Sequence, residues 1–305
     1  MNKINYYHSL IFFNLCILLS AFEFLRDNSL LIVCLFLILS LGISHGALDH
    51  IKGKKLLKIF EIKNIYIFYL IYIFIASTVI VLWTIMPSVS LTIFLIVASF
   101  HFGKEDTQFL IVENSYYNQL LFFLKGLLVI LAPMFFHFEE TISIFKLLLI
   151  DNESFYRTLD FIEMNNLILF GIFLSTLSSI LLFTKEFELK KFTIFLDYFS
   201  ILIINYYLSP LMAFTIYFCF LHSTRHGITL MHELDENDLK NGLKIFIKKA
   251  LPLTILTATF CLLGLYLLNN SYNFDSSILK VIFIGLASLT FPHILLEYLI
   301  EKNEK

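Results

Sequence analysis

Charged side chains are scarce in this sequence. Only 15% of its 305 residues are Asp, Glu, Lys or Arg, whereas 58% are hydrophobic and the mean hydropathy is +0.82. A typical soluble domain is about half apolar and about one quarter charged. This composition excludes an ordinary soluble domain, and the net charge of −2 argues against a nucleic acid partner, because no strong basic excess is present.

Several sequence signals are also missing. The four cysteines show no CxxC spacing and all fall in apolar segments, which favours buried thiols over a disulfide framework or a zinc site. No internal repeat and no low-complexity linker divides the chain, so we predict a single integral-membrane domain over 1–305. No small-residue cleavage site follows the first apolar run, which predicts a retained first helix.

The apolar residues gather into segments that approach the ~20 residues needed to cross a bilayer. We therefore predict an all-α fold, a polytopic integral-membrane helical bundle of about ten transmembrane helices. The expected spans are 9–24, 30–48, 65–86, 88–103, 118–136, 166–183, 192–208, 210–230, 250–268 and 279–299. A shorter apolar run at 141–150 predicts an interfacial segment.

The basic residues give an independent test of this topology. With ten spans and a cytoplasmic N-terminus, 17 of the 22 Lys and Arg residues, Arg225 among them, fall in cytoplasmic loops or tails. Cytoplasmic loops are enriched in Lys and Arg, because positive charge resists translocation. We therefore expect a multi-pass protein of the cell (inner) membrane, in contact with lipid, with both termini in the cytoplasm.

Histidines lie at one depth in four of the expected spans. His45, His101, His222 and His293 each lie 12 to 15 residues from the outer end of an even-numbered span. That is roughly 20 Å into the bilayer, in its cytoplasmic third. Ionisable groups inside a membrane are costly and are usually functional. The shared depth favours a common site over separate helix-to-helix hydrogen bonds.

The spacing of the histidines indicates which rings can share a ligand. His222 and His226 form an HxxxH pair on one helix face, so both rings can reach one metal ion. His45 and His50, in GISHGALDH (42–50), point some 140° apart on a helix, which favours His45 as the ligand. Asp49 shares the face of His45 and can accept its second ring N–H.

Residues near these histidines are assigned to the surroundings of the site. His50 is expected at the interface, at the start of a Lys-rich loop. His293 and Glu297, four positions apart, are interpreted as residues of the pocket that support the site. Glu105 and Asp106, directly after the segment with His101, are expected to face the cytoplasmic interface.

Four motifs together resemble the Brp/Blh family of bacterial and archaeal membrane proteins, the β-carotene 15,15′-dioxygenases that form retinal. They are GxxHGALDH at 42–50, HFG at 101–103, HSTRH at 222–226 and PHxxxE at 292–297. The resemblance implies an Fe(2+) centre held by His45, His101, His222 and His226. It further implies cleavage of β-carotene by O2 into two molecules of all-trans-retinal, with retinal-binding rhodopsins as acceptors.

Two alternatives remain open. A membrane di-iron desaturase, hydroxylase or carotenoid ketolase also uses HxxxH boxes, but such enzymes need about eight histidines and typically an adjacent His-His pair, which this chain lacks. A metal or proton transporter would use intramembrane histidines as a relay. A relay is expected to be staggered through the membrane, whereas these histidines share one level.

Overall fold

The computed structural model describes residues 2–26, 30–111, 115–185 and 188–303, except for the side chains of Asn2, Arg26, His45 and Leu189. These residues form helices and turns and no strand. The longer helices are α1 (Asn2–Ser20), α3 (Asp49–Ile59), α4 (Tyr66–Ile85), α5 (Pro87–Glu105), α6 (Tyr116–Phe136), α7 (Phe138–Leu147), α8 (Glu153–Met164), α9 (Leu167–Thr184), α10 (Thr193–Tyr207), α12 (Thr224–Leu234), α13 (Leu239–Leu268) and α14 (Phe274–Asn303). The all-α prediction is confirmed.

Within the described residues, seven helical stretches are long and apolar enough to cross a membrane. They are Leu31–Ile59, Tyr66–Ile85, Pro87–Glu105, Tyr116–Phe136, Leu167–Thr184, Leu239–Leu268 and Phe274–Asn303. The other three expected spans coincide with α1, with α10 and with the stretch from α11 (Pro210–Ile216) to α12. The total of about ten spans stays a prediction. The run at 141–150 lies mostly in α7, which presents its apolar side to the core.

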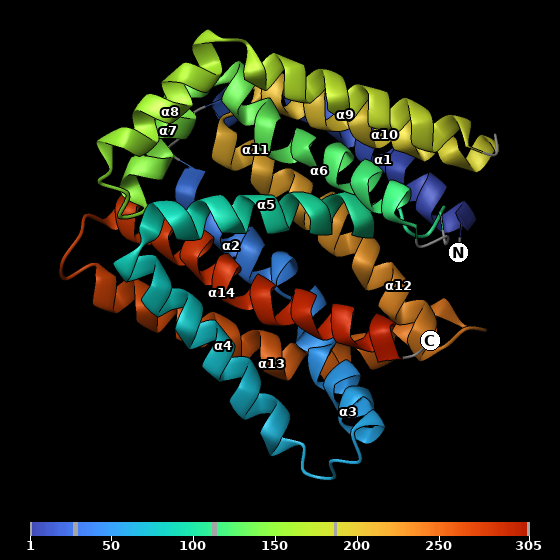
Figure 1. Cartoon of the computed structure of the whole chain (residues 1–305). Coiled ribbons are helices and arrows are strands. Elements are labelled where there is room, and N and C mark those ends of the chain that lie inside the picture. Colours follow the sequence, from blue (N-terminus) through green and yellow to red (C-terminus); the bar gives the residue numbers. More distant parts are fainter. Residues whose placement is uncertain (1, 27–29, 112–114, 186–187, 304–305) are drawn as a thin grey trace.

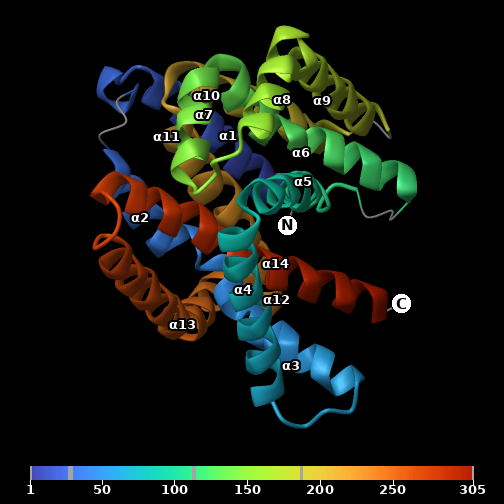
Figure 2. The same ribbon diagram turned by 60° about the vertical axis from the view of Figure 1, so that its left-hand side comes forward.

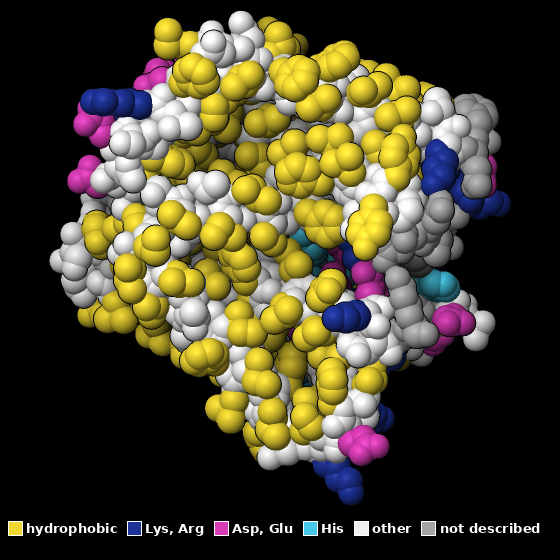
Figure 3. All heavy atoms as spheres, in the orientation of Figure 1, with side chains coloured by type: hydrophobic (Ala, Val, Ile, Leu, Met, Phe, Trp, Pro, Cys, Tyr) yellow, Lys and Arg dark blue, Asp and Glu magenta, His cyan; other side chains and the backbone are white. Residues whose placement is uncertain are grey.

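The helices form two groups with two elements between them (Figures 1 and 2). On one side α1, α6, α9 and α10 pack together, and on the other α4 and α13 pack against α14. Helix α5 and the stretch α11–α12 lie between the groups, and Figure 1 places both chain ends on its right-hand side. The face in Figure 3 is mainly hydrophobic but is hollowed towards the right, where histidine and acidic side chains are visible.

Two glycines hold α5 against α6 at backbone distance. A Cβ at Gly103 would lie 1.8 Å from the Phe122 carbonyl oxygen, and one at Gly126 would lie 1.8 Å from that of Ser99. No larger residue fits at either position without separating the helices. Close approach of this kind through small residues is a common form of helix packing in membranes. It fixes the position of α5, which carries residues of the candidate site.

Two short stretches of the chain are wound as π-helix. The first, η3 (Ile38–Gly42), continues from α2 (Leu31–Leu37), and the second, η6 (Tyr217–Ser223), joins α11 to α12. They contact each other, and the Ser223 hydroxyl donates to the Gly42 carbonyl at 3.0 Å. Single π turns within α-helices occur frequently at functional sites. Here η6 contains His222, and η3 ends three residues before His45.

Candidate functional site

The end of α5 brings one histidine and two carboxylates between the helix groups. His101 is 5% exposed and Asp106 is 3% exposed. Glu105 lies one turn after His101, and its side chain is also buried. The expectation that Glu105 and Asp106 face the cytoplasmic interface is therefore wrong. Their carboxylates point at histidines from another helix, because the tight α5–α6 contact sets α5 deep in the bundle.

Each histidine of the HxxxH pair meets one of these two carboxylates. Nδ1 of His222 lies 3.3 Å from Oδ1 of Asp106, and Nδ1 of His226 lies 2.8 Å from Oε2 of Glu105. The Tyr217 hydroxyl donates to the second oxygen of Asp106 at 2.7 Å. Since Nδ1 is the nitrogen engaged in both rings, Nε2 of each ring is directed away from its carboxylate.

A third histidine–carboxylate pair joins α14 to the start of α3. Nδ1 of His293 lies 2.9 and 3.0 Å from the two oxygens of Asp49, and the Tyr72 hydroxyl donates to Asp49 at 2.9 Å. Among the described side chains, Asp49 thus supports His293. The predicted contact of Asp49 with His45 involves a side chain outside the described residues.

The rings gather into one cluster. The ring centroid of His101 lies 5.1 Å from that of His222 and 5.4 Å from that of His293. The centroid of His226 lies 5.7 Å from that of His293. The structure therefore brings together four histidines from η6, α5, α12 and α14. His293, which the sequence assigned to the surroundings, lies between His101 and His226.

Glu297 extends the cluster towards the end of α14. One ligand atom each from His101, His293 and Glu297 lie within 4.8 Å of one another, and so do ligand atoms of Glu105, His226 and Glu297. Lys52 donates to Oε1 of Glu297 at 2.8 Å. Two histidines with one carboxylate is the donor set of many non-haem Fe(II) oxygenases.

The two histidines of GISHGALDH occupy different surroundings. His45 begins a short 3₁₀ turn, η4 (His45–Leu48), and its side chain lies outside the described residues, so its predicted role as a ligand stays a prediction. Nδ1 of His50 contacts the Ala47 carbonyl at 3.0 Å. His50 belongs to neither group of close ligand atoms found among the described residues.

A buried ion pair lies beside the cluster. Arg225, which the sequence analysis counted among the cytoplasmic charges, is 2% exposed and donates to both oxygens of Asp197 at 2.7 and 3.0 Å. It also donates to the Asp106 carbonyl at 3.1 Å and to the Ser9 hydroxyl at 2.6 Å. Asp197 and Arg225 lie in two consecutive apolar segments of the sequence, and opposite charges in such segments are the signal from which this pair could have been predicted.

The donor set suits a bound metal ion. Imidazole and carboxylate ligands bind iron and related transition metals. Histidines that bind metals usually donate their other ring N–H to a carboxylate or carbonyl, which fixes ring orientation. His222, His226 and His293 each have such a carboxylate, so the cluster has both the candidate ligands and the groups that would orient them.

Comparison with known proteins identifies the family. The family model described as Beta-carotene 15,15′-dioxygenase matches residues 36–301. The chain belongs to the β-carotene 15,15′-dioxygenase family. The chain is also similar to the Beta-carotene 15,15′-dioxygenase of an uncultured marine bacterium, 66A03, with 29% identity over 267 residues that cover 86% of this chain and 90% of that protein. No solved structure matches.

The match to the dioxygenase family includes all of the candidate site. Every residue from His45 to Glu297 lies within 36–301, and the resemblance that the motifs predicted is confirmed. A cavity of about 740 Å³ opens beside the cluster, with His101, His293 and Asp49 in its wall. The rest of its wall comes mainly from apolar residues of α4, α13 and α14. The volume is in the usual range of sites for organic ligands.

Proposed function

We propose that this chain cleaves β-carotene at its central 15,15′ double bond with O2 and forms two molecules of all-trans-retinal. The observation that carries the proposal is the position of the histidine–carboxylate cluster in the wall of an apolar cavity. Membership of the dioxygenase family supports it. A carotenoid dissolved in the bilayer can reach such a cavity from the side, because α4 and α13 have mostly exposed apolar surfaces.

We further propose Fe(2+) as the metal of the site. Bound iron would supply the positions at which O2 is activated. His101, His222 and His226, with His45, are the proposed ligands from the sequence, and the structure adds His293 and Glu297 as candidates.

The role of the remaining residues is to orient and to shield the cluster. Asp49, Glu105 and Asp106 hold three imidazoles by Nδ1, so Nε2 is the nitrogen of each ring that would bind the metal. The apolar cavity wall excludes water and holds the polyene so that its central bond lies beside the cluster. The released retinal would then pass to a retinal-binding rhodopsin.

Co-expression of the protein in cells that accumulate β-carotene tests this function. We expect loss of the orange pigment and appearance of retinal only when O2 is present, and His101→Ala cells should keep their β-carotene. Chromatography of pigment extracts identifies the products. Apocarotenals longer than C20 would argue against central cleavage, and new ring oxygens on an intact polyene would favour a ketolase.

The membrane topology is a second proposal. We propose that α1, α10 and the stretch α11–α12 also cross the membrane, which gives ten spans with both termini in the cytoplasm. Reporter fusions after Leu56 and after Ile150 are then expected to report opposite sides. Both fusions reporting one side would rule out this arrangement.

A further inference from the structure

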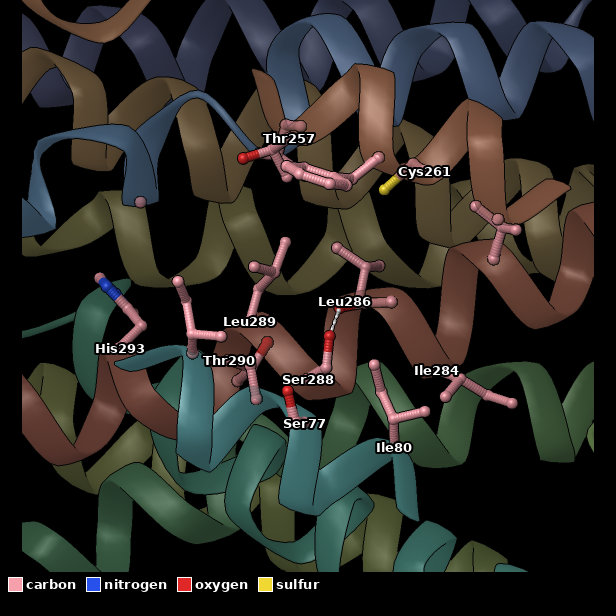
Figure 4. A pocket seen from close by; sticks show the side chains of 18 of the residues that line it. Ser77, Ile80, Thr257, Cys261, Ile284, Leu286, Ser288, Leu289, Thr290 and His293 are labelled. Atoms are coloured by element: carbon pink, nitrogen blue, oxygen red, sulfur yellow. Dashed lines mark hydrogen bonds between the residues drawn. The ribbon is translucent and has the colours of Figure 1, made fainter. Parts of the chain in front are cut away.

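The cavity follows α14 away from the histidine cluster. Along α14 its wall runs from His293 to Lys280, thirteen positions or about 20 Å along the helix axis. Figure 4 shows His293 at one end, Ser77 and Ile80 of α4 on one side and Thr257 and Cys261 of α13 on the other. The cavity is therefore elongated, and the cluster lies near one end.

Two hydroxyl groups in the wall are bonded to carbonyls of their own helices. The Ser288 hydroxyl donates to the Gly285 carbonyl at 2.7 Å, and the Thr84 hydroxyl donates to the Val81 carbonyl at 2.8 Å. These two hydroxyls are thus engaged, and most of the other residues in the wall are apolar. A long hydrocarbon is the class of ligand that such a wall accepts.

Two glycines in the wall have no packing role in the protein. Apart from the backbone of its own helix, a Cβ added at Gly264 of α13 or at Gly285 of α14 would meet no atom of the described residues within 4 Å. At Gly103, by contrast, a Cβ would collide with the backbone of α6. A glycine inside a helix destabilises the helix relative to alanine. Since no neighbour needs that space in the protein, the two glycines leave it to the cavity.

Gly285 lies about as far from the histidine cluster as a terminal ring of the carotenoid lies from its central bond. Gly285 lies eight residues, or about 12 Å along the axis, from His293. Helices α13 and α14 are consecutive and antiparallel, so Gly264, which follows Cys261 in α13, lies nearer their connecting turn and farther along the cavity from His293 than Cys261 does. β-Carotene is about as long as the ~30 Å core of a bilayer is thick. Each of its terminal rings therefore lies about 15 Å from its central bond.

A lysine marks the far end of the cavity. Nζ of Lys280 lies 4.0 Å from the centroid of the Tyr272 ring and donates to the Leu147 carbonyl at 2.6 Å and to the Ser276 hydroxyl. The side chains of Lys280, Tyr272 and Ser276 are thus held in place by contacts within the protein. A hydrocarbon ring gains nothing by passing an ammonium group, so this end limits how deep a substrate can go.

We propose that Gly264 and Gly285 form the binding site for one terminal ring of the carotenoid and thereby set which double bond lies at the cluster. The inference rests on the proposed function for the identity of its ligand. The glycines determine specificity by the space that they leave, while the ring, stopped before Lys280, places the central bond about 15 Å away, beside His101 and His293.

Binding of β-carotene to purified, chelator-treated protein tests the inference without catalysis. We expect Gly285→Leu and Gly264→Leu to weaken β-carotene binding about tenfold, because each side chain fills the place of the ring. Gly285→Ala adds one methyl group and is expected to change binding by less than about fourfold. Thr259→Leu, at an exposed position of α13 outside the cavity, is the matched control and should bind like the wild type.

The products of the variants give a second readout. Cleavage by O2 breaks one C=C bond and forms two C=O bonds, one on each fragment. If the ring stops nearer the cluster in Gly285→Leu, the cut moves off centre, and two unequal apocarotenals appear whose carbon atoms still add up to those of β-carotene. A merely damaged enzyme would instead form less retinal and no other aldehyde.

The outcomes separate this inference from the proposed function. Wild-type binding by both leucine variants, or an equal loss in Thr259→Leu, overturns the ring site. A lower unfolding temperature of the leucine variants also contradicts it, since the inference requires open space at both positions. The wild type can also form no retinal while the two leucine variants bind β-carotene more weakly, as expected. That result would support the ring site and contradict the proposed cleavage.

Discussion

Replacement of His101 by alanine is expected to reduce retinal formation by well over a hundredfold and to remove the iron that we propose for the site. His101 lies next to both His222 and His293, and it belongs both to the histidine set proposed from the sequence and to the group with Glu297. Loss of an outer partner of a metal ligand typically costs 10–100-fold, so loss of a ligand costs more. Retinal per unit of protein and iron by elemental analysis measure the two effects.

Other histidine variants decide between the two ligand sets and serve as controls. Loss of iron in His45→Ala, His222→Ala and His226→Ala supports the four-histidine set. Loss of iron in both single variants His293→Ala and Glu297→Gln supports the group of His101, His293 and Glu297. His137→Ala and His232→Ala should change neither iron nor activity, and His50→Ala should be milder than His45→Ala. Full activity and full iron content in His101→Ala would place the metal elsewhere.

Replacement of Arg225 by methionine is expected to destabilise the fold by about 3–5 kcal/mol, because it leaves the carboxylate of Asp197 buried without its cation. The Asp106 carbonyl and the Ser9 hydroxyl lose the same donor. Thermal unfolding in detergent, followed by size-exclusion chromatography, measures the loss. The double variant Arg225→Met/Asp197→Leu should recover much of it, since an apolar pair can replace a buried ion pair.

An exposed ion pair provides the matched control. Arg157 contacts Glu153 at 2.6 Å, but both side chains are more than 70% exposed. Surface pairs contribute about 0–1 kcal/mol, so Arg157→Met should hardly change the unfolding temperature. Equal effects of Arg225→Met and Arg157→Met would show that the buried pair is not a major contributor to stability.

The helices and part of the site were predictable from the sequence for physical reasons. Apolar segments of span length have to satisfy their backbone groups internally, so they form helices. Histidines in such segments are costly, and their shared depth placed His101, His222 and His293 at one level before any contact was known. The structure brings these three rings together.

The supporting carboxylates were not predictable in the same way. His293 and Asp49 are 244 residues apart, and no local spacing connects them. Glu105 and Asp106 follow an apolar segment, where a solvent-exposed end is the normal expectation. Only the close contact of α5 with α6 and the passage of η6 beside α5 turn these two side chains inward. The pairing of helices, which sequence periodicity does not specify, decided their role.

The π-helical turn of η6 makes the length of this stretch as important as its composition. A π turn holds one residue more than the α-helical turn that it replaces. If the seven residues Tyr217–Ser223 rewound as α-helix at unchanged length, all of α12 would rotate by about 100° relative to α11. His226 would then lose its contact with Glu105, and Arg225 would lose its contact with Asp197. Working homologues that lack the π turn should therefore be one residue shorter in this stretch, because only then does α12 keep its orientation.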